Sequence, residues 1–295
     1  MDRTEAGGTP ASFSIRPEGA MLITSPDNRR VRQAVSLGAR KQRDASGLYL
    51  VEGPNPVREA LEQDVVLQAL FFLEEDAVSQ SRADELVPLR RLAADRKRPP
   101  EIFSLSRALF QKITQTQTPQ GVLAIAEKAV YSEETFFAPR GGNVLVLDRI
   151  QDPGNLGTLL RTAEAAGFSG AMLLKGCGDV YGPKAVRAAA GTLFRLPLLF
   201  PETPQEALDL LRKHGKKIYA AVAGGHVPYY DCPLTEDAAI VIGNEGNGVS
   251  LELQQAADCM LSIPMAGRSE SLNAALAGGI IMYEAYRQQL ASAHK

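Results

Sequence analysis

The second half of the chain alternates short hydrophobic runs with stretches whose apolar residues have helical spacing. The runs predict strands at residues 143–148, 171–175, 196–200, 217–222, 238–243 and 259–264. The stretches between them predict helices at residues 155–167, 183–190, 201–215, 251–258 and 271–290. Apolar strands that alternate with helices are typical of a mainly parallel α/β sheet covered by helices. Ligands of such sheets bind beyond the carboxyl ends of the strands, so the loops there are the first candidates for a site.

The first half of the chain carries shorter elements of the same two kinds. The predicted strands are 48–51, 69–73, 101–105 and 121–127. The predicted helices are 56–63, 106–113 and a first one that Asp27 or Asn28 caps and that runs to about Arg40. This pattern predicts a small α/β layer structure.

Two polar segments divide the chain. Residues 1–20 are rich in glycine, proline, serine and threonine and have no periodicity, which predicts a disordered tail. Residues 128–142 end in Pro139, Arg140 and two glycines just before a strongly apolar run, which predicts a linker. We therefore expect two domains, at 21–127 and 143–295.

Charge excludes a generally basic nucleic-acid-binding protein. The 295 residues include 32 basic and 34 acidic side chains, for a net charge of −2, so any contact with nucleic acid needs a local basic patch. Two clusters qualify. The first comprises Arg29, Arg30, Arg32, Arg40, Lys41 and Arg43, and the second comprises Arg90, Arg91, Arg96, Lys97 and Arg98. From composition alone, solvated helix faces explain both clusters better than RNA contact does.

Cysteine and histidine usage narrows the chemistry. The chain has three cysteines and three histidines, and no pair of them has zinc-finger spacing. No apolar run is long enough to cross a bilayer. An odd cysteine count without a signal peptide favours a reducing compartment, so we expect a cytoplasmic protein with no metal and no membrane span.

The loop after strand 143–148 contains the first group of candidate residues. Pro153, Gly154 and Gly157 predict a tight turn, and Asn155 stands where a helix cap would. Arg161 lies off the apolar stripe of the helix that follows, so it is expected at the surface. Taken alone, a capping asparagine and a surface arginine explain these residues.

The loop after strand 238–243 has the sequence GNEGNG, residues 243–248. Its three glycines permit close backbone approach to a ligand. Glu245 would repel a phosphate, so the loop suits a neutral, cationic or hydroxyl-rich ligand better. A hairpin-like turn is the alternative.

The loop after strand 259–264 leads into the last helix. Ser269 or Ser271 is expected to cap that helix. Its first turns hold many small residues, namely Ala274, Ala275, Ala277, Gly278 and Gly279. Small residues there predict that another backbone packs very close, with a plain helix N-terminus as the alternative.

Taken together, these loops carry a family resemblance. The segments NLGTLLRTAEAAGF, IVIGNEGNGVS and LSIPMAGRSESLNAALAGGIIMYEAYR resemble, in order and spacing, the three motifs of the SpoU (TrmH-type) branch of the SPOUT RNA 2′-O-ribose methyltransferases. The resemblance covers about residues 143–290. The segments SPDNRRVRQAVSL, YLVEGPNPVREAL and TPQGVLAI are similar to the L30e-like substrate-binding domain of the rRNA-modifying members.

The resemblance implies a fold and a reaction. It implies an α/β domain with a deep trefoil knot, a homodimer formed through that domain, and transfer of a methyl group from S-adenosyl-L-methionine to a ribose 2′-OH in 23S rRNA. The residues it implies for cofactor binding are Ala223, Gly224, Gly243, Asn244, Gly246, Ile263, Met265, Ser271, Leu272 and Ala275.

The resemblance also implies catalytic roles for Asn155, Arg161, Glu245, Ser271 and Asn273. Arg161 is expected to hold a phosphate and stabilise the alkoxide, because a guanidinium is a poor base. Asn155 would orient the ribose or Arg161, and Glu245 would hold one of the two in place. Ser271 and Asn273 would lie near the methyl group.

Three alternatives compete with this assignment. One is a tRNA 2′-O-methyltransferase. Another is a non-catalytic RNA-binding paralogue, against which the presence of Asn155, Arg161 and Glu245 counts. A Rossmann-type oxidoreductase is the third, and the absence of GxGxxG after strand 143–148 counts against it.

Overall fold

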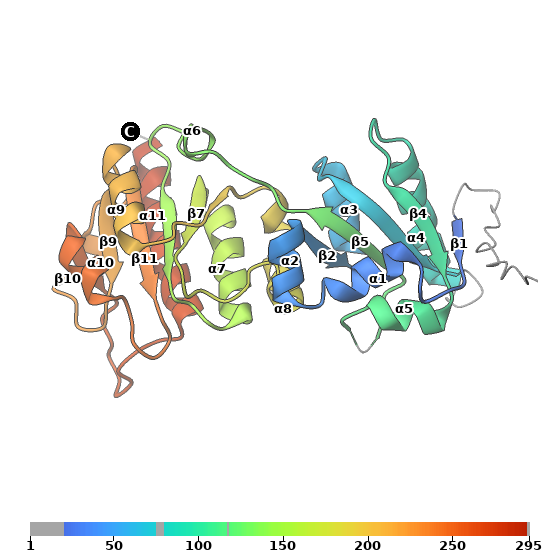
Figure 1. Ribbon diagram of the computed structural model, residues 1–295. Coiled ribbons are helices and arrows are strands. Elements are labelled where there is room, and N and C mark those ends of the chain that lie inside the picture. The colour runs from blue at the N-terminus through green and yellow to red at the C-terminus, as the bar shows by residue number, and fades with distance from the viewer. Residues whose placement is uncertain (1–20, 75–79, 117, 294–295) are drawn as a thin grey trace, which may run out of the picture. The chain divides into compact units, whose positions relative to one another are not determined.

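The computed structural model describes residues 21–74, 80–116 and 118–293, so the predicted tail at 1–20 lies outside the described residues. The chain divides after Lys128 into two compact units, which are described separately below (Figure 1).

The N-terminal unit is built on a five-stranded sheet with the order β1-β4-β3-β5-β2. Its strands are β1 (Met21–Ile23), β2 (Leu48–Glu52), β3 (Leu67–Leu73), β4 (Glu101–Leu105) and β5 (Val122–Glu127). Its helices are α1 (Arg29–Ser36), α2 (Arg40–Ser46), α3 (Pro54–Glu62), α4 (Gln80–Ala94) and α5 (Arg107–Ile113). Strands β1, β4 and β3 are parallel, and β5 pairs antiparallel with both β3 and β2.

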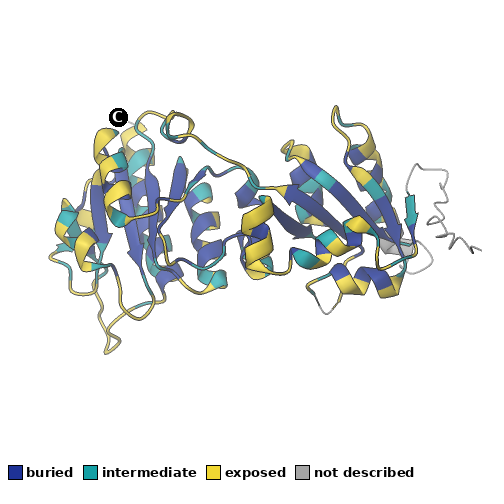
Figure 2. Cartoon of the chain, in the orientation of Figure 1, coloured by how far each residue is buried: buried dark blue, intermediate teal, exposed yellow. Residues whose placement is uncertain are grey.

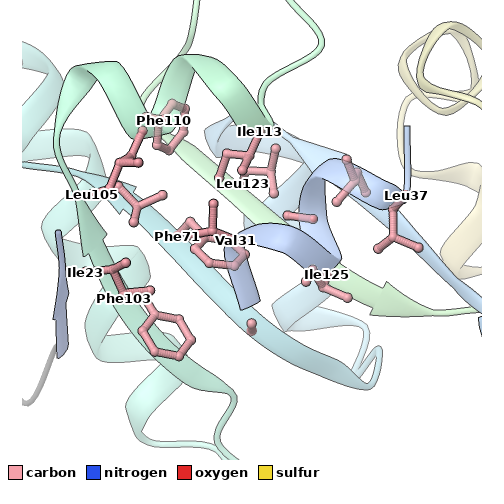
Figure 3. Packing of buried hydrophobic residues seen from close by; sticks show 14 of the residues in the cluster. Ile23, Val31, Leu37, Phe71, Phe103, Leu105, Phe110, Ile113, Leu123 and Ile125 are labelled. Carbon is pink, nitrogen blue, oxygen red and sulfur yellow. The ribbon is translucent and has the colours of Figure 1, made fainter. Parts of the chain in front are cut away.

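One face of this sheet carries a hydrophobic core. Helices α1 and α5 place Val31 and Phe110 against the sheet, where the rings of Phe71 and Phe103 stack with centroids 5.5 Å apart (Figure 3). Each of these four side chains is buried, so hydrophobic burial holds the two helices on the sheet.

The first predicted helix was wrong in its extent. The helix α1 ends at Ser36 and a turn at residues 37–39 follows it, whereas α2, which begins at Arg40, was not predicted. Asn28 caps α1 as predicted and accepts a hydrogen bond from the backbone N–H of Arg30. Arg43 is buried, and its guanidinium donates to the carbonyl oxygens of Leu37 and Gly38. That buried cation closes the turn, which helical periodicity does not report. Strand β1 and helix α4 were not predicted.

The C-terminal unit contains a seven-stranded sheet with the order β10-β12-β9-β11-β6-β7-β8, and all of its neighbouring strands pair in parallel. Its strands are β6 (Val144–Asp148), β7 (Gly170–Leu173), β8 (Leu198–Leu199), β9 (Lys217–Ala221), β10 (Val227–Pro228), β11 (Ala238–Gly243) and β12 (Cys259–Ser262). Its helices are α6 (Glu133–Phe136), α7 (Pro153–Ala165), α8 (Pro183–Ala189), α9 (Pro204–Lys213), α10 (Leu251–Ala256) and α11 (Ala274–Ala293). Short 3₁₀ turns occupy Thr192–Phe194 and Tyr229–Asp231. The parallel α/β sheet is therefore confirmed, whereas α6 and β10 were not predicted.

Both faces of this sheet are covered. The central strands β6 and β11 are buried along their whole length, and Figure 2 shows dark-blue strands between helices with exposed outer faces. Helices α6, α9 and α10 share a core with Val144 and Val146 of β6. On the other face α7 packs against α8 and α11. Continuous apolar strands are what a doubly covered sheet requires.

Two glycines set how closely the helices pack. A Cβ on Gly278 of α11 would lie 2.4 Å from Leu159 Cδ2 on α7, so glycine at this position lets α11 pack closely on α7. A Cβ on Gly157 would lie 2.4 Å from Ala188 Cβ and 2.7 Å from the backbone nitrogen of Ala189. Gly157 therefore lets α8 approach α7. It lies inside α7, so the prediction that it shapes a tight turn was wrong.

The strand order places the candidate loops together. Strands β12, β9, β11 and β6 are consecutive neighbours and parallel, so their carboxyl ends lie at one edge of the sheet. The three candidate loops follow β6, β11 and β12. The trefoil knot stays a prediction.

Candidate active site

A cavity of about 660 Å³ lies at the ends of β9, β11 and β12. Nine of the ten predicted cofactor-binding residues line it, namely Ala223, Gly224, Gly243, Asn244, Gly246, Ile263, Met265, Ser271 and Leu272. The tenth, Ala275, is not among the lining residues, and its backbone N–H donates to Asn273 Oδ1 at 2.9 Å. The volume falls within the range of roughly 300–1,000 Å³ that is typical of small-molecule sites.

The edge of the cavity is a loop that turns back across the end of β11. Asn244 and Gly248 exchange two backbone hydrogen bonds, with N···O distances of 3.0 and 2.9 Å, so the hairpin-like alternative is the geometry present. A Cβ on Gly243 would lie 2.1 Å from the backbone nitrogen of Val249. Only glycine at position 243 permits this return, because any side chain would collide with the loop backbone.

Glu245 links that loop to the start of α7. Its Oε1 accepts hydrogen bonds from Asn155 Nδ2 at 3.0 Å and from the backbone N–H of Asp152 at 3.2 Å. Its Oε2 accepts from the backbone N–H of Gln151 at 3.3 Å. Burial raises the pKa of Glu245, but these hydrogen bonds outweigh it and hold the pKa below its ordinary value. Glu245 is therefore ionised near neutral pH and suits an anchoring role better than that of a general base.

Asn155 does not cap α7, contrary to prediction. Asp152 is the cap, and its Oδ1 accepts from the backbone N–H of Asn155 at 2.8 Å. The Asn155 side chain is therefore available to two other loops. It donates to Glu245 and its Oδ1 accepts from Asn273 Nδ2 at 3.0 Å.

Asn273 performs the capping that we had predicted for Ser269 or Ser271. Its Oδ1 accepts from the backbone N–H groups of Ala275 and Leu276 at 2.9 and 3.2 Å. The hydrogen-bond chain Glu245–Asn155–Asn273 thus joins all three candidate loops. Ser271 lines the cavity beside it.

Arg161 is exposed on α7, six residues beyond Asn155. Within the described part of the chain it has no hydrogen-bond or ion-pair partner. A guanidinium without an internal counter-ion is available to an anion from outside, and its planar fork suits a phosphate.

Sequence reasoning missed Asp148 and Arg149, which contact the loop at 244–250. Asp148 is buried at the end of β6. The sequence feature that could have pointed to it is an aspartate directly after an apolar run, since a carboxylate is rarely buried without a partner. In the described ranges no cluster of three or more histidine, cysteine, aspartate or glutamate side chains is arranged to hold a metal ion. No helix among the same residues is long and apolar enough to cross a membrane.

The relatives and solved structures described here that resemble this chain are named as methyltransferases. Residues 142–283 match the SpoU rRNA Methylase family, and residues 28–124 match the MRM3-like substrate binding domain. The 23S rRNA (guanosine(2553)-2′-O)-methyltransferase RlmP of Bacillus subtilis is 33% identical over 261 residues, covering 88% of this chain and 97% of that protein. The chain therefore belongs to the SpoU rRNA methylase family.

Two further relatives extend the match. The 23S rRNA (uridine(2479)-2′-O)-methyltransferase of Streptomyces viridochromogenes is 31% identical, over 93% of this chain and 95% of that protein. The crystal structure of an AdoMet-bound rRNA methyltransferase from Sinorhizobium meliloti superposes with a TM-score of 0.79 at 29% identity, over 90% of this chain and 97% of the other. Both units therefore have counterparts in single known proteins.

Proposed function

We propose that the protein transfers a methyl group from S-adenosylmethionine to the 2′-oxygen of one ribose in 23S rRNA. The observation that carries the proposal is the chain Glu245–Asn155–Asn273 beside the cavity, with the exposed Arg161 on the same helix as Asn155. The relatives that span both units and are named for 23S rRNA support this substrate.

The cavity suits this cofactor. Its walls include the apolar side chains of Ile242, Leu261 and Leu272, which suit a flat aromatic base, and it is edged by glycine backbone. Glu245 and Glu270 add two carboxylates to the lining, which favours a cationic ligand over a phosphate. When bound, S-adenosylmethionine supplies an electrophilic methyl group on a positively charged sulfur.

The work left to the protein concerns the alcohol. Glu245 holds Asn155, and Asn155 with Asn273 orients the hydroxyl groups of the ribose. Arg161 holds the adjacent phosphate and stabilises negative charge that develops on the 2′-oxygen. Ser271 completes the surroundings of the transferred methyl group. The proton of the 2′-hydroxyl group passes to solvent water as the oxygen takes the methyl group. Alignment and charge stabilisation lower the barrier, so no described side chain needs to act as a strong base.

The N-terminal unit is proposed to bind the RNA through part of its first basic cluster. Arg29, Arg32, Arg40 and Lys41 are exposed on α1 and α2. The other two members serve the fold, since Arg30 pairs with Glu101 and Arg43 closes the turn between the helices.

The second basic cluster includes members that hold the fold together. Arg90 is buried with its guanidinium carbon 4.6 Å from the centroid of the Phe72 ring. Arg96 donates to the Val65 carbonyl at 2.9 Å and pairs with Asp64. The first cluster keeps four exposed basic side chains on two adjacent helices, whereas the second keeps three, Arg91, Lys97 and Arg98, so we place the phosphate contacts on the first cluster.

We also propose a homodimer formed through the C-terminal unit, as the family resemblance implies, and we place its interface at α11. Leu276, Tyr283 and Leu290 recur every seven residues and are 54%, 50% and 46% exposed, so one apolar stripe faces outward. A second copy of the same stripe would bury it. A ribosomal RNA substrate and three free cysteines fit a reducing cytoplasm.

The test is a map of ribose methylation in total RNA from cells with and without the gene. One 23S rRNA position should lose its 2′-O-methyl group and regain it with the wild-type gene, but not with Arg161→Ala. The relatives act on a guanosine and a uridine at similar identity, so the map also identifies the nucleotide. A change confined to tRNA, or no change at all, would contradict the proposal.

A further inference from the structure

Asp148 is a buried carboxylate that the reaction does not use. It ends β6 with 2% of its surface exposed. Its Oδ1 accepts from Arg149 Nε at 2.9 Å, and its Oδ2 accepts from Arg149 Nη2 at 3.2 Å and from the backbone N–H of Ser250 at 2.7 Å. A buried charge is tolerated only when it is paired and hydrogen-bonded, so this carboxylate, Arg149 and Ser250 depend on one another.

Arg149 contacts both ends of the loop at 244–248. Its backbone carbonyl accepts from Asn244 Nδ2 at 2.9 Å, and its Nη2 donates to the Gly248 carbonyl at 3.4 Å. The residue has a φ of +58°, in the left-handed region that disfavours side chains larger than glycine. A non-glycine residue persists in that conformation where its surroundings require it, and such residues cluster at functional sites.

The loop has few other supports. Residues 245–248 are exposed, and Val249 is the first buried apolar side chain after Gly243. Besides the pair at 148–149, the loop is tied to the rest of the unit through Glu245 and its contacts at the start of α7, and through Val249. The Val249 side chain lies in the core, and its carbonyl accepts from Gln254 Nε2 at 2.6 Å. Polar contacts therefore decide where Glu245 and the cavity edge lie.

We propose that Asp148 and Arg149 form a positioning pair that sets the loop at 244–250, and through it the cavity edge and the Glu245–Asn155 hydrogen bond. The effect on methyl transfer rests on the proposed function, whereas the effect on loop order does not. Neither residue is proposed to touch the ribose.

The test uses the full-length protein with Arg149→Gly, Arg149→Lys and the double variant Asp148→Asn/Arg149→Gly. Glycine tolerates the left-handed backbone, so Arg149→Gly removes the side chain without adding strain. The double variant also removes the charge of Asp148, in case an unpaired buried carboxylate prevents folding. The control is Arg195→Gln, which breaks a similar two-bond ion pair with Glu164 on α7 that does not contact the loop.

Three readouts separate positioning from general stability. They are amide hydrogen exchange over residues 243–250 compared with β6, the Kd for S-adenosylmethionine, and the single-turnover methylation rate. Arg149→Gly should speed amide exchange in the loop but not in β6. It should also weaken cofactor binding or slow methylation by roughly 10- to 100-fold, because hydrogen bonds to charged groups contribute effects of that size. Arg149→Lys should recover part of the loss, because it keeps the charge without the planar fork. Arg195→Gln should match wild type in all three.

Two results would overturn the proposal. One is loop exchange and cofactor Kd within twofold of wild type in Arg149→Gly. The other is equal loss of protection in β6 and the loop in both the single and the double variant, since the pair would then support the whole sheet. If the variants loosen the loop and weaken cofactor binding while the wild-type protein methylates no RNA, the proposed function fails and the positioning role stands.

Discussion

Replacing Arg161 with alanine separates a catalytic role from a structural one. The side chain is exposed and has no hydrogen-bond or ion-pair partner in the described part of the chain, so its loss should change the free energy of unfolding by no more than about 0.5 kcal/mol. It is also absent from the lining of the cavity, so the Kd for S-adenosylmethionine should stay within twofold of wild type.

The methylation rate should nevertheless fall. Removing one preorganised electrostatic contact to the developing oxyanion costs roughly 10²–10³ in rate, or about 2.7–4 kcal/mol. Lysine at position 161 should restore only part of the rate, because an ammonium cannot reproduce two parallel hydrogen bonds to phosphate oxygens.

The assay is single-turnover transfer of labelled methyl groups to ribosomal RNA, with enzyme in excess. Arg140→Ala is the matched control, since Arg140 is an exposed arginine of the same unit that also has no hydrogen-bond or ion-pair partner in the described part of the chain and lies outside the candidate site. A near-normal single-turnover rate for Arg161→Ala would refute the reasoning. Joint loss of fold and cofactor binding would instead make Arg161 a structural residue.

Three further outcomes are expected. Glu245→Gln should lower the methylation rate about tenfold with little change in Tm, because one amide oxygen cannot accept all four hydrogen bonds of the carboxylate. The folded-state pKa of Glu245 is lowered, so these hydrogen bonds persist as pH falls and are lost only below the ordinary glutamate value of about 4.3. If the wild-type methylation rate fell with a midpoint near pH 6, and Glu245→Gln abolished that fall, this prediction would be contradicted. Arg32→Ala should reduce the slope of log K for RNA binding against log salt concentration by roughly one, without lowering Tm. Arg43→Ala should lower Tm, because Arg43 closes the turn between α1 and α2. Equal slopes for Arg32→Ala and wild type in filter-binding titrations would exclude a phosphate contact by Arg32. Tyr283→Glu should convert a dimer into monomers in sedimentation velocity, and an unchanged sedimentation coefficient would exclude α11 as the interface.

The three candidate loops could be located from sequence because their positions follow from local patterns. Continuous apolar runs predicted β6, β11 and β12, and parallel strands end at one edge of their sheet. The order of the motifs then identified the family, which the relatives confirm.

Local patterns were wrong where several side chains compete for one role. The segment Asp152-Pro153-Gly154-Asn155 offers two capping residues, and either could start a helix at Pro153 or just beyond it. The structure assigns the cap to Asp152, which leaves Asn155 to join the other loops. Likewise, six basic residues within fifteen positions look alike in sequence, yet Arg43 is buried and Arg40 is exposed.

The sequence by itself determined the strands and helices that carry the candidate loops, because helical and strand periodicities act over a few residues. It also supplied the chemical groups of the site. Only the tertiary structure decided which of these groups meet, since Asn155 contacts Glu245 across 90 positions and Asn273 across 118. Those pairings depend on the order in which β6, β11 and β12 enter the sheet, and no local pattern contains that order. The buried pair of Asp148 and Arg149 belongs to the same category, because its partners at 248 and 250 come within reach only when β11 lies beside β6.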